Sequence, residues 1–461
     1  MGLRPGAKDM KPLVIIHGWN DEAKSFTALA NALLQHTGRK VEHIWLGNYT
    51  SLDDDVHISD LVAALGRAWV SSQLPDKAKS VDVIVHSTGG LILRSWIAQQ
   101  YTGIGLTPPI NNLVMLAPAN FGSPLAHKGR AFYGRVLKGF GSDKPLETGE
   151  HILKALEIAS PFSWQLAEAD RITHTVYNPT QVRTTVIIGN CGYDGISSIA
   201  NERGSDGTIY LAGASLNCAR VEADFASNPQ QPTLRTMATP ADECAFLVLD
   251  KHDHSSIALK EPRHKGNPEL IDAIATALAV RNGTDYRAWV KQCQSRTHAL
   301  MDKYANRRDD YKHGYQNTVF RVRDDQGNEV TDYVIEFYQK THRGVLNQKT
   351  RELNAKAIAK VHAYQDNASY RSFMINCTQL HAMINEKGEN LRISLSAMPD
   401  LHHEKTLAGY RSFQDKDIGH LELNHQSIKT LFVANRTLLI NITLKREHKQ
   451  KLLTLQGADH W

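Results

Sequence analysis

The sequence predicts an α/β protein whose mostly parallel sheet is covered by helices on both faces, followed by a β-rich domain. Short apolar runs alternate with segments of helical spacing from the N-terminus to about residue 281. These apolar runs are continuous, as is typical of parallel strands buried on both faces. After residue 315 the alternation stops and strand-like runs follow one another. We therefore expect two domains of different class.

The chain has 461 residues, of which 41% are hydrophobic. This length favours at least two domains, each with its own core. We place the first domain at residues 1–283 and a polar, helical linker at residues 284–316. The C-terminal domain is expected at residues 317–461.

The strands expected in the first domain are residues 13–16, 41–45, 81–85, 113–116, 184–188 and 245–249. The helices expected between and after them are residues 25–36, 58–70, 89–99 and 268–280. Their apolar residues recur at helical spacing. Asp21 can cap the first of these helices, and Pro268 occupies the first turn of the last one.

Residues 132–177 interrupt this rhythm with apolar helical segments, and the whole insertion spans about residues 125–180. One interpretation is an ordinary packed helical insertion. The other is a helical cap over a hydrophobic acyl pocket, because such insertions often cover the active sites of α/β folds.

In the C-terminal domain, residues 319–322 and 333–338 predict two strands around a turn that contains Gly327. Further strands are expected at residues 358–364, 373–377, 391–395, 430–433 and 438–444. A small β-sandwich accounts best for this pattern.

One segment predicts a catalytic nucleophile. The strand that ends in Val83-Ile84-Val85-His86 runs directly into Ser87, and Gly89 and Gly90 open the next helix. A serine on such a turn is forced out at the C-terminal edge of the sheet, where the helix N-terminus stabilises a developing oxyanion. The alternative is a chance serine before a glycine pair.

At these residues the sequence resembles the α/β-hydrolase lipases, in which this turn carries the nucleophile in a Gly-x-Ser-x-Gly pattern. Val85 stands where the first glycine of that pattern normally lies. The resemblance covers about residues 11–281 and implies an α/β-hydrolase fold with Ser87 as the nucleophile.

The resemblance also implies an oxyanion hole. His17-Gly18-Trp19 follows the first strand, where these lipases begin their oxyanion loop. The backbone N–H groups of Trp19 and Thr88 would then bind the oxyanion. Trp19 can equally serve as a wall of the pocket. The segment from Pro118 to Ser123 is similar to one that lines the lipase site as scaffold.

The resemblance also implies an acid and a base, which follow the fifth and sixth strands in the order serine, acid, histidine. Asp206 lies in an Asp-Gly turn and Asp194 is its rival, although a turn is the commonest use of either residue. His254 follows the last strand, with His252 as the second choice. These two histidines could instead bind a metal, but no other ligand cluster supports that interpretation.

These residues predict a serine carboxylic-ester hydrolase that needs no metal and no cofactor. The apolar insertion, the lipase-like motifs and the added β domain favour acyl esters of lipids, as in a lipase or a phospholipase A. An esterase for soluble esters and a lipid acyltransferase are alternatives within this chemistry. A non-catalytic binding protein on a hydrolase scaffold is the alternative of another class.

Charge and cysteine content limit the partners and the compartment. The net charge of +5 and the pI of about 8.8 favour anionic surfaces such as a lipid membrane, whereas no basic run indicates nucleic acid. Five widely spaced cysteines favour free thiols in a reducing compartment, with one or two disulfides if the protein is exported.

The sequence shows no signal peptide and no run of about 18 apolar residues that could span a membrane. We therefore expect synthesis in the cytoplasm and, if the protein is secreted, export without a cleavable signal. In this respect the chain resembles the lipase effectors that bacteria deliver by type VI secretion. That resemblance implies an immunity or secretion protein as partner of the C-terminal domain.

Overall fold

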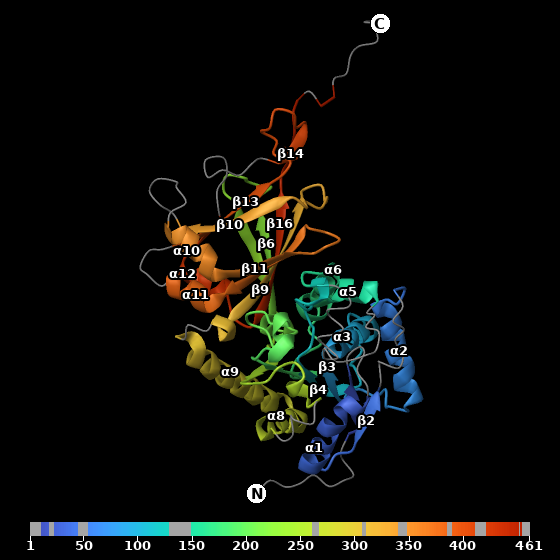
Figure 1. Cartoon of the computed structure of the whole chain (residues 1–461). Coiled ribbons are helices and arrows are strands. Elements are labelled where there is room, and N and C mark those ends of the chain that lie inside the picture. The colour runs from blue at the N-terminus through green and yellow to red at the C-terminus, as the bar shows by residue number, and fades with distance from the viewer. Residues whose placement is uncertain are drawn as a thin grey trace, which may run out of the picture. The chain divides into compact units, whose positions relative to one another are not determined.

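The computed structural model describes residues 11–17, 23–44, 54–128, 149–260, 267–306, 310–339, 348–384, 390–410, 421–450 and 452–453. The chain forms two compact units (Figure 1). The first unit contains Met1–Cys218, Thr239–Tyr315 and Asn435–Thr437. The second contains Ala219–Ala238, Gln316–Ala434 and Leu438–Trp461.

The first unit is built on a six-stranded sheet with the order β2-β1-β3-β4-β5-β8, in which every pairing is parallel. The strands are β1 (Leu13–Ile16), β2 (Val41–Ile44), β3 (Val81–His86), β4 (Ile110–Leu116), β5 (Arg183–Gly189) and β8 (Ala245–Leu249). All but β2 are described as buried along their whole length. Burial on both faces explains why their sequences are continuously apolar, and it confirms the predicted α/β class.

Four helices lie close to their predicted positions: α1 (Thr27–Thr37), α2 (Ile58–Ser71), α3 (Thr88–Tyr101) and α8 (Pro268–Ala279). Helix α1 packs against α8, and α2 packs against α3. Helix α1 ends at Gly38, whose φ of 72° forms a left-handed cap. Asp21, the predicted cap of this helix, lies outside the described residues.

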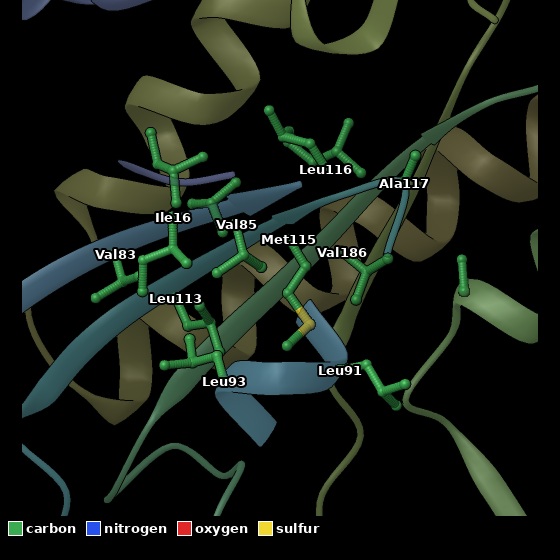
Figure 2. Close-up of a cluster of buried hydrophobic side chains, with 14 of the residues drawn as sticks. Ile16, Val83, Val85, Leu91, Leu93, Leu113, Met115, Leu116, Ala117 and Val186 are labelled. Atoms are coloured by element: carbon green, nitrogen blue, oxygen red, sulfur yellow. The ribbon is translucent and has the colours of Figure 1, made fainter. Parts of the chain in front are cut away.

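Helix α3 is fixed against the centre of the sheet. Figure 2 shows Leu113 and Met115 of β4 on the same side of the sheet as Leu91 and Leu93 of α3. All four side chains are fully buried. This packing holds the first turn of α3 against the ends of β3 and β4, which is the edge where a nucleophile is expected.

Residues 284–316 are not a simple linker. Helix α9 (Gly283–Ala305) packs along β8, the edge strand of the parallel sheet. Trp289 Nε1 donates a hydrogen bond to Thr185 Oγ1 at 2.9 Å, and Thr297 Oγ1 accepts one from the amide of Val248 at 3.1 Å. Thr297 therefore satisfies one amide of the edge strand, while Trp289 binds a side chain of the neighbouring strand β5. The polar residues on the remaining faces of α9 explain why its sequence resembles an exposed linker.

The second unit contains two sheets that share one apolar core. The larger sheet has the order β11-β12-β9-β16-β6-β7, and the smaller has the order β10-β13-β15. Their strands are β6 (Cys218–Asp224), β7 (Thr233–Ala238), β9 (Tyr315–Asp324), β10 (Tyr333–Gln339), β11 (Ile358–Ala363), β12 (Tyr370–Asn376), β13 (Leu391–Ala397), β15 (Leu421–Leu423) and β16 (Arg436–Leu444). A further pair joins β14 (Ala408–Tyr410) to β17 (Arg446–His448). This arrangement agrees with the predicted β-rich, sandwich-like domain.

The second unit differs from the sequence prediction in its boundary. The hairpin of β6 and β7 lies inside residues 1–283, yet it belongs to the second unit. Its neighbour in the sheet is β16, about 200 residues further along the chain. Local patterning cannot reveal so distant a pairing, because it reports only which residues are apolar.

The strands β9 and β10 do not pair as a hairpin. The turn between them exists, with Gly327 at a φ of 89° and with the Asp324 carboxylate accepting from the amides of Gln326 and Asn328. The two strands then enter different sheets.

Helices α10 (Gln348–Ala357), α11 (Cys377–Met383) and α12 (His425–Leu431) also lie in the second unit, where only strands were predicted. The strand expected at residues 430–433 was wrong, because α12 ends there. Asn424 caps that helix by accepting from the amide of Ser427.

The insertion of the first unit contains α5 (Glu150–Leu156), α6 (Pro161–Ala167) and a π-helical turn, η3 (Glu168–Thr173). Residues 129–148 lie outside the described part of the chain. All five cysteines are free thiols. Among the described helices, none combines the length and the apolar character needed to cross a membrane.

Candidate active site

Ser87 occupies a strained turn between β3 and α3. Its φ of 54° and ψ of −127° are unusual for a residue with a side chain. The turn is held by three backbone hydrogen bonds: Ser87 donates to Leu116, and its carbonyl accepts from Gly90 and Ala119. The strain is therefore maintained by the surrounding chain, as expected for a serine that must project from the edge of the sheet.

Two glycines allow this turn to form. A Cβ atom on Gly89 would lie 2.9 Å from the carbonyl oxygen of Ile16, and one on Gly90 would lie 2.8 Å from Pro118 Cβ. Both distances are shorter than van der Waals contact, so α3 can approach β1 and the loop after β4 only with glycine there. Val85, which replaces the first glycine of the lipase pattern, is accommodated as a fully buried strand residue.

The structure brings Ser87, His254 and Asp206 into one hydrogen-bonded series. His254 Nε2 lies 3.1 Å from Ser87 Oγ, and His254 Nδ1 lies 2.9 Å from Asp206 Oδ2. All three residues are at most 3% exposed. A carboxylate only accepts hydrogen bonds, so Nδ1 carries the proton and Nε2 is left to accept from the serine hydroxyl.

The turn around Asp206 fixes the carboxylate. Asp206 Oδ1 accepts from the amides of Thr208 at 2.9 Å and Ile209 at 2.7 Å, which leaves Oδ2 for His254. Gly207 has a φ of 96°, and a Cβ there would lie 2.7 Å from the ring of Tyr193. Burial and the nearby charge of Asp206 raise the pKa of Tyr193 well above its usual value, so this phenol stays neutral over the turn.

Neither of the alternative residues, Asp194 and His252, belongs to the hydrogen-bonded series that starts at Ser87. Asp194 is exposed and precedes the short helix Gly195–Ala200. His252 uses its ring to contact Ser256 Oγ at 3.2 Å and Asn267 Nδ2 at 2.5 Å. Asn267 caps α8, so His252 supports that helix.

The described residues contain no group of three or more His, Cys, Asp or Glu side chains that could hold a metal ion. In the pair that the sequence offered, both rings already contact protein groups through both nitrogens.

The predicted oxyanion donors are described only in part. Thr88 is the first residue of α3, where backbone N–H groups have no acceptor within the helix. The helix dipole there favours a negative charge close to Ser87. Trp19 lies outside the described residues.

Comparison with solved structures gives a match over nearly the whole chain. Phospholipase PlaB from Legionella pneumophila aligns with a TM-score of 0.80 and 24% identity, over 97% of this chain and 96% of that one. Its complex with thio-NAD aligns with a TM-score of 0.78 and 22% identity over the same shares. The chain has an α/β-hydrolase fold.

The mature Bacillus licheniformis lipase BlEst2 aligns over 58% of this chain and 91% of its own, with 16% identity and a TM-score of 0.37. No protein-family model and no curated protein matches the sequence.

Within this α/β-hydrolase fold, a buried ion pair joins α3 to the insertion. Arg94 donates from Nε and Nη2 to the two carboxylate oxygens of Asp170, each at 2.9 Å, and both side chains are completely buried. Its Nη1 donates to the carbonyl of Asn120. Arg94 was not among the predicted residues, although an arginine directly after the apolar run Leu91-Ile92-Leu93 indicates a buried charge.

Ser123 is a second supporting residue whose contacts were not predicted. Its Oγ donates to the carbonyl of Thr208 at 2.7 Å, and its amide donates to the carbonyl of Leu156 in α5. The scaffold segment after β4 therefore links the turn of Asp206 to the insertion.

Proposed function

We propose that the protein is a serine carboxylic-ester hydrolase that cleaves acyl esters of lipids through an acyl-enzyme on Ser87. The hydrogen-bonded series from Ser87 through His254 to Asp206 carries this proposal. A nucleophile, a base and an orienting acid at these distances support acyl transfer.

In the first half of the reaction, His254 Nε2 takes the hydroxyl proton as Ser87 Oγ attacks the ester carbonyl carbon. The carboxylate of Asp206 keeps the proton on Nδ1 and stabilises the imidazolium that forms. The amides of Thr88 and Trp19 are the proposed donors to the oxyanion. The imidazolium then gives its proton to the departing alcohol oxygen, and the acyl group stays on Ser87.

In the second half, a water molecule loses a proton to His254 Nε2 and attacks the acyl-enzyme. The carboxylic acid leaves as the proton returns to Ser87 Oγ. The same base therefore serves both steps, and no metal or cofactor takes part.

The proposed substrate is an ester of a lipid. The insertion carries buried apolar helices, and the net charge of +5 favours an anionic surface. The structurally similar PlaB is named a phospholipase. We propose cleavage of the carboxylic esters of phospholipids, as in a phospholipase A. Export by type VI secretion and a protein partner for the C-terminal domain stay predictions.

The nucleophile is tested by the Ser87→Ala variant in hydrolysis of p-nitrophenyl acyl esters. We expect a rate at least 10³-fold lower, because no acyl-enzyme can form. Ser95→Ala is the matched control: Ser95 is a buried serine of α3, the helix that follows Ser87, and its Oγ donates to the carbonyl of Leu91. Full activity in Ser87→Ala would refute the proposal.

The substrate class is tested with phospholipid vesicles and mass spectrometry of the products. Release of fatty acid and lysophospholipid is the expected result. Cleavage of short soluble esters without cleavage of vesicles would favour the soluble esterase. Transfer to an added alcohol in preference to water would favour the acyltransferase. A fluorophosphonate probe that fails to label Ser87 would favour the non-catalytic scaffold.

A further inference from the structure

We infer that His86 is a positioning residue that holds the base, His254, by its main chain. The inference rests on the proposed function, because the placement of His254 affects the reaction only if that residue is the base. His86 itself transfers no proton in the mechanism above.

The contact is direct and buried. His86 is the last residue of β3, and its ring Nε2 lies 3.2 Å from the carbonyl oxygen of His254. The centroids of the two imidazole rings are 4.8 Å apart, with 48° between their planes. His86 is 0% exposed and His254 is 1% exposed. The side chain of a strand residue therefore reaches the loop that follows β8.

The remaining polar atoms of His254 are held as well. Its amide donates to the carbonyl of Asp206 at 3.0 Å, and Nδ1 contacts the carboxylate of the same residue. Asp206 thus holds the amide and one ring nitrogen, while His86 and Ser87 hold the carbonyl and the other ring nitrogen. Two consecutive residues, the last residue of β3 and Ser87 after it, therefore hold the carbonyl and ring Nε2 of the base.

An aromatic stack lies behind His86. The ring of Phe26 is 5.7 Å from the ring of His86, and the ring of His17 stacks on Phe26 at 5.5 Å. Lys260 Nζ lies 5.7 Å from the centroid of Phe26. Phe26 and His17 are fully buried, so they restrict rotation of His86 away from His254.

The contact specifies the protonation of His86. A carbonyl oxygen only accepts, so His86 Nε2 must carry a hydrogen in order to bind it. The neutral ring protonated on Nε2 provides that donor without adding a charge beside the base. The contact matters because it fixes the position of His254. A displacement of a catalytic group by about 1 Å can cost about 10²-fold in rate.

The test compares two nearly isosteric variants. His86→Gln keeps an N–H donor at similar reach, whereas His86→Met has a similar length and no donor. We expect kcat for a short soluble ester to fall about tenfold in His86→Met, the size of one lost hydrogen bond. KM should stay unchanged, because substrate binding is not affected. His86→Gln should recover most of the loss, and thermal unfolding shows whether both variants fold.

Rescue by the variant that keeps the donor separates positioning from a general structural effect. A role in packing alone would predict the same kcat in His86→Gln and His86→Met, because the two side chains have similar length. A role through the hydrogen bond predicts a higher kcat in His86→Gln. Equal kcat values in the two variants would overturn the inference.

Two further measurements keep the result unambiguous. Activity that survives Ser87→Ala contradicts the proposed function, whereas activity lost in Ser87→Ala but unchanged in His86→Met contradicts only the role of His86. The wild-type protein gives a test that needs no variant to fold. In its ¹⁵N-histidine NMR spectrum, His86 should carry its proton on Nε2, and a ring protonated only on Nδ1 would overturn the inference.

Discussion

At the scale of single residues, the site depends on which hydrogen-bonding atoms of each side chain are already bound to other protein groups. Asp206 uses one carboxylate oxygen for two backbone amides and offers the other to His254. His252, only two residues from His254, has its ring directed to Ser256 and to the cap of α8. The same residue type therefore serves in one place as a candidate base and in the other as a helix support.

The choice between Asp206 and Asp194 is tested by replacing each with asparagine. Asp206→Asn should lower kcat by about 10⁴-fold. The asparagine amide would not keep the proton on Nδ1 of His254, so the imidazole would adopt the wrong tautomer. Asp194→Asn should leave kcat within about twofold, since this side chain is exposed and surface substitutions have small effects. Initial rates on a p-nitrophenyl ester measure both. Equal losses would contradict the assignment of the acid.

At the scale of elements, the turn between β3 and α3 is possible because helix and strands approach each other closely. Gly89 meets the main chain of β1, and Gly90 meets Pro118 in the loop after β4. Because the main chain of β1 cannot move without disturbing the sheet, the closeness of these elements is part of the site.

Substitution of Gly89 by alanine should therefore destabilise the fold by about 1–3 kcal/mol and reduce activity, as overpacking does elsewhere. Gly66→Ala in α2 is the matched control. Its Cβ would meet only Trp96 Nε1, at 3.6 Å, and alanine favours a helix over glycine by about 1 kcal/mol. Thermal unfolding and ester hydrolysis measure both variants. A Gly89→Ala variant as stable as Gly66→Ala would disprove the close-approach argument.

The insertion is joined to α3 by the ion pair of Arg94 and Asp170. Arg94→Met or Asp170→Leu alone should each cost about 3–5 kcal/mol, because each leaves a buried charge without its partner. The double variant should lose less than the sum of the two single losses. Urea unfolding gives the three free energies. Strict additivity would show that the pair does not act as a unit.

At the scale of the whole molecule, ion pairs join the end of β8 to α9 and to the residues that follow it. Asp250, directly after β8, pairs with Lys303 and Lys312. Burial by itself would raise the pKa of the Asp250 carboxyl. Hydrogen bonds from Lys303, Lys312, Tyr304 and Asn190 nevertheless hold this pKa well below its usual range. A lowered pKa in the folded state means that the folded protein binds this proton less readily than the unfolded chain does.

The pH dependence of stability follows from that sign. The contribution of Asp250 should be fully present above about pH 4, where the unfolded carboxyl is ionised, and should be lost as the pH falls further. Asp250→Asn should therefore be less stable than the wild type at pH 7, and the difference should shrink below pH 4. Thermal unfolding across this range measures it. A difference that grows towards acid pH would contradict the assignment.

The sequence alone determined the class of the first unit, because burial on both faces leaves continuous apolar runs that can be read directly. It also indicated Ser87, Asp206 and His254, since a strand–serine–glycine turn and the order of the later loops are local features. Helix α9 misled the prediction, because only one of its faces is buried against the sheet and most of its other residues are polar, as in an exposed linker.

Only the tertiary structure decided between Asp206 and Asp194 and between His254 and His252 as neighbours of Ser87. Two residues apart in sequence, the histidines differ in where their rings point, and that direction is set by packing between distant segments. The pairing of β6 with β16 and the contact of His86 with the carbonyl of His254 are of the same kind. Local sequence pattern records which residues are buried, whereas the partner of each buried polar atom depends on the folding of the whole chain.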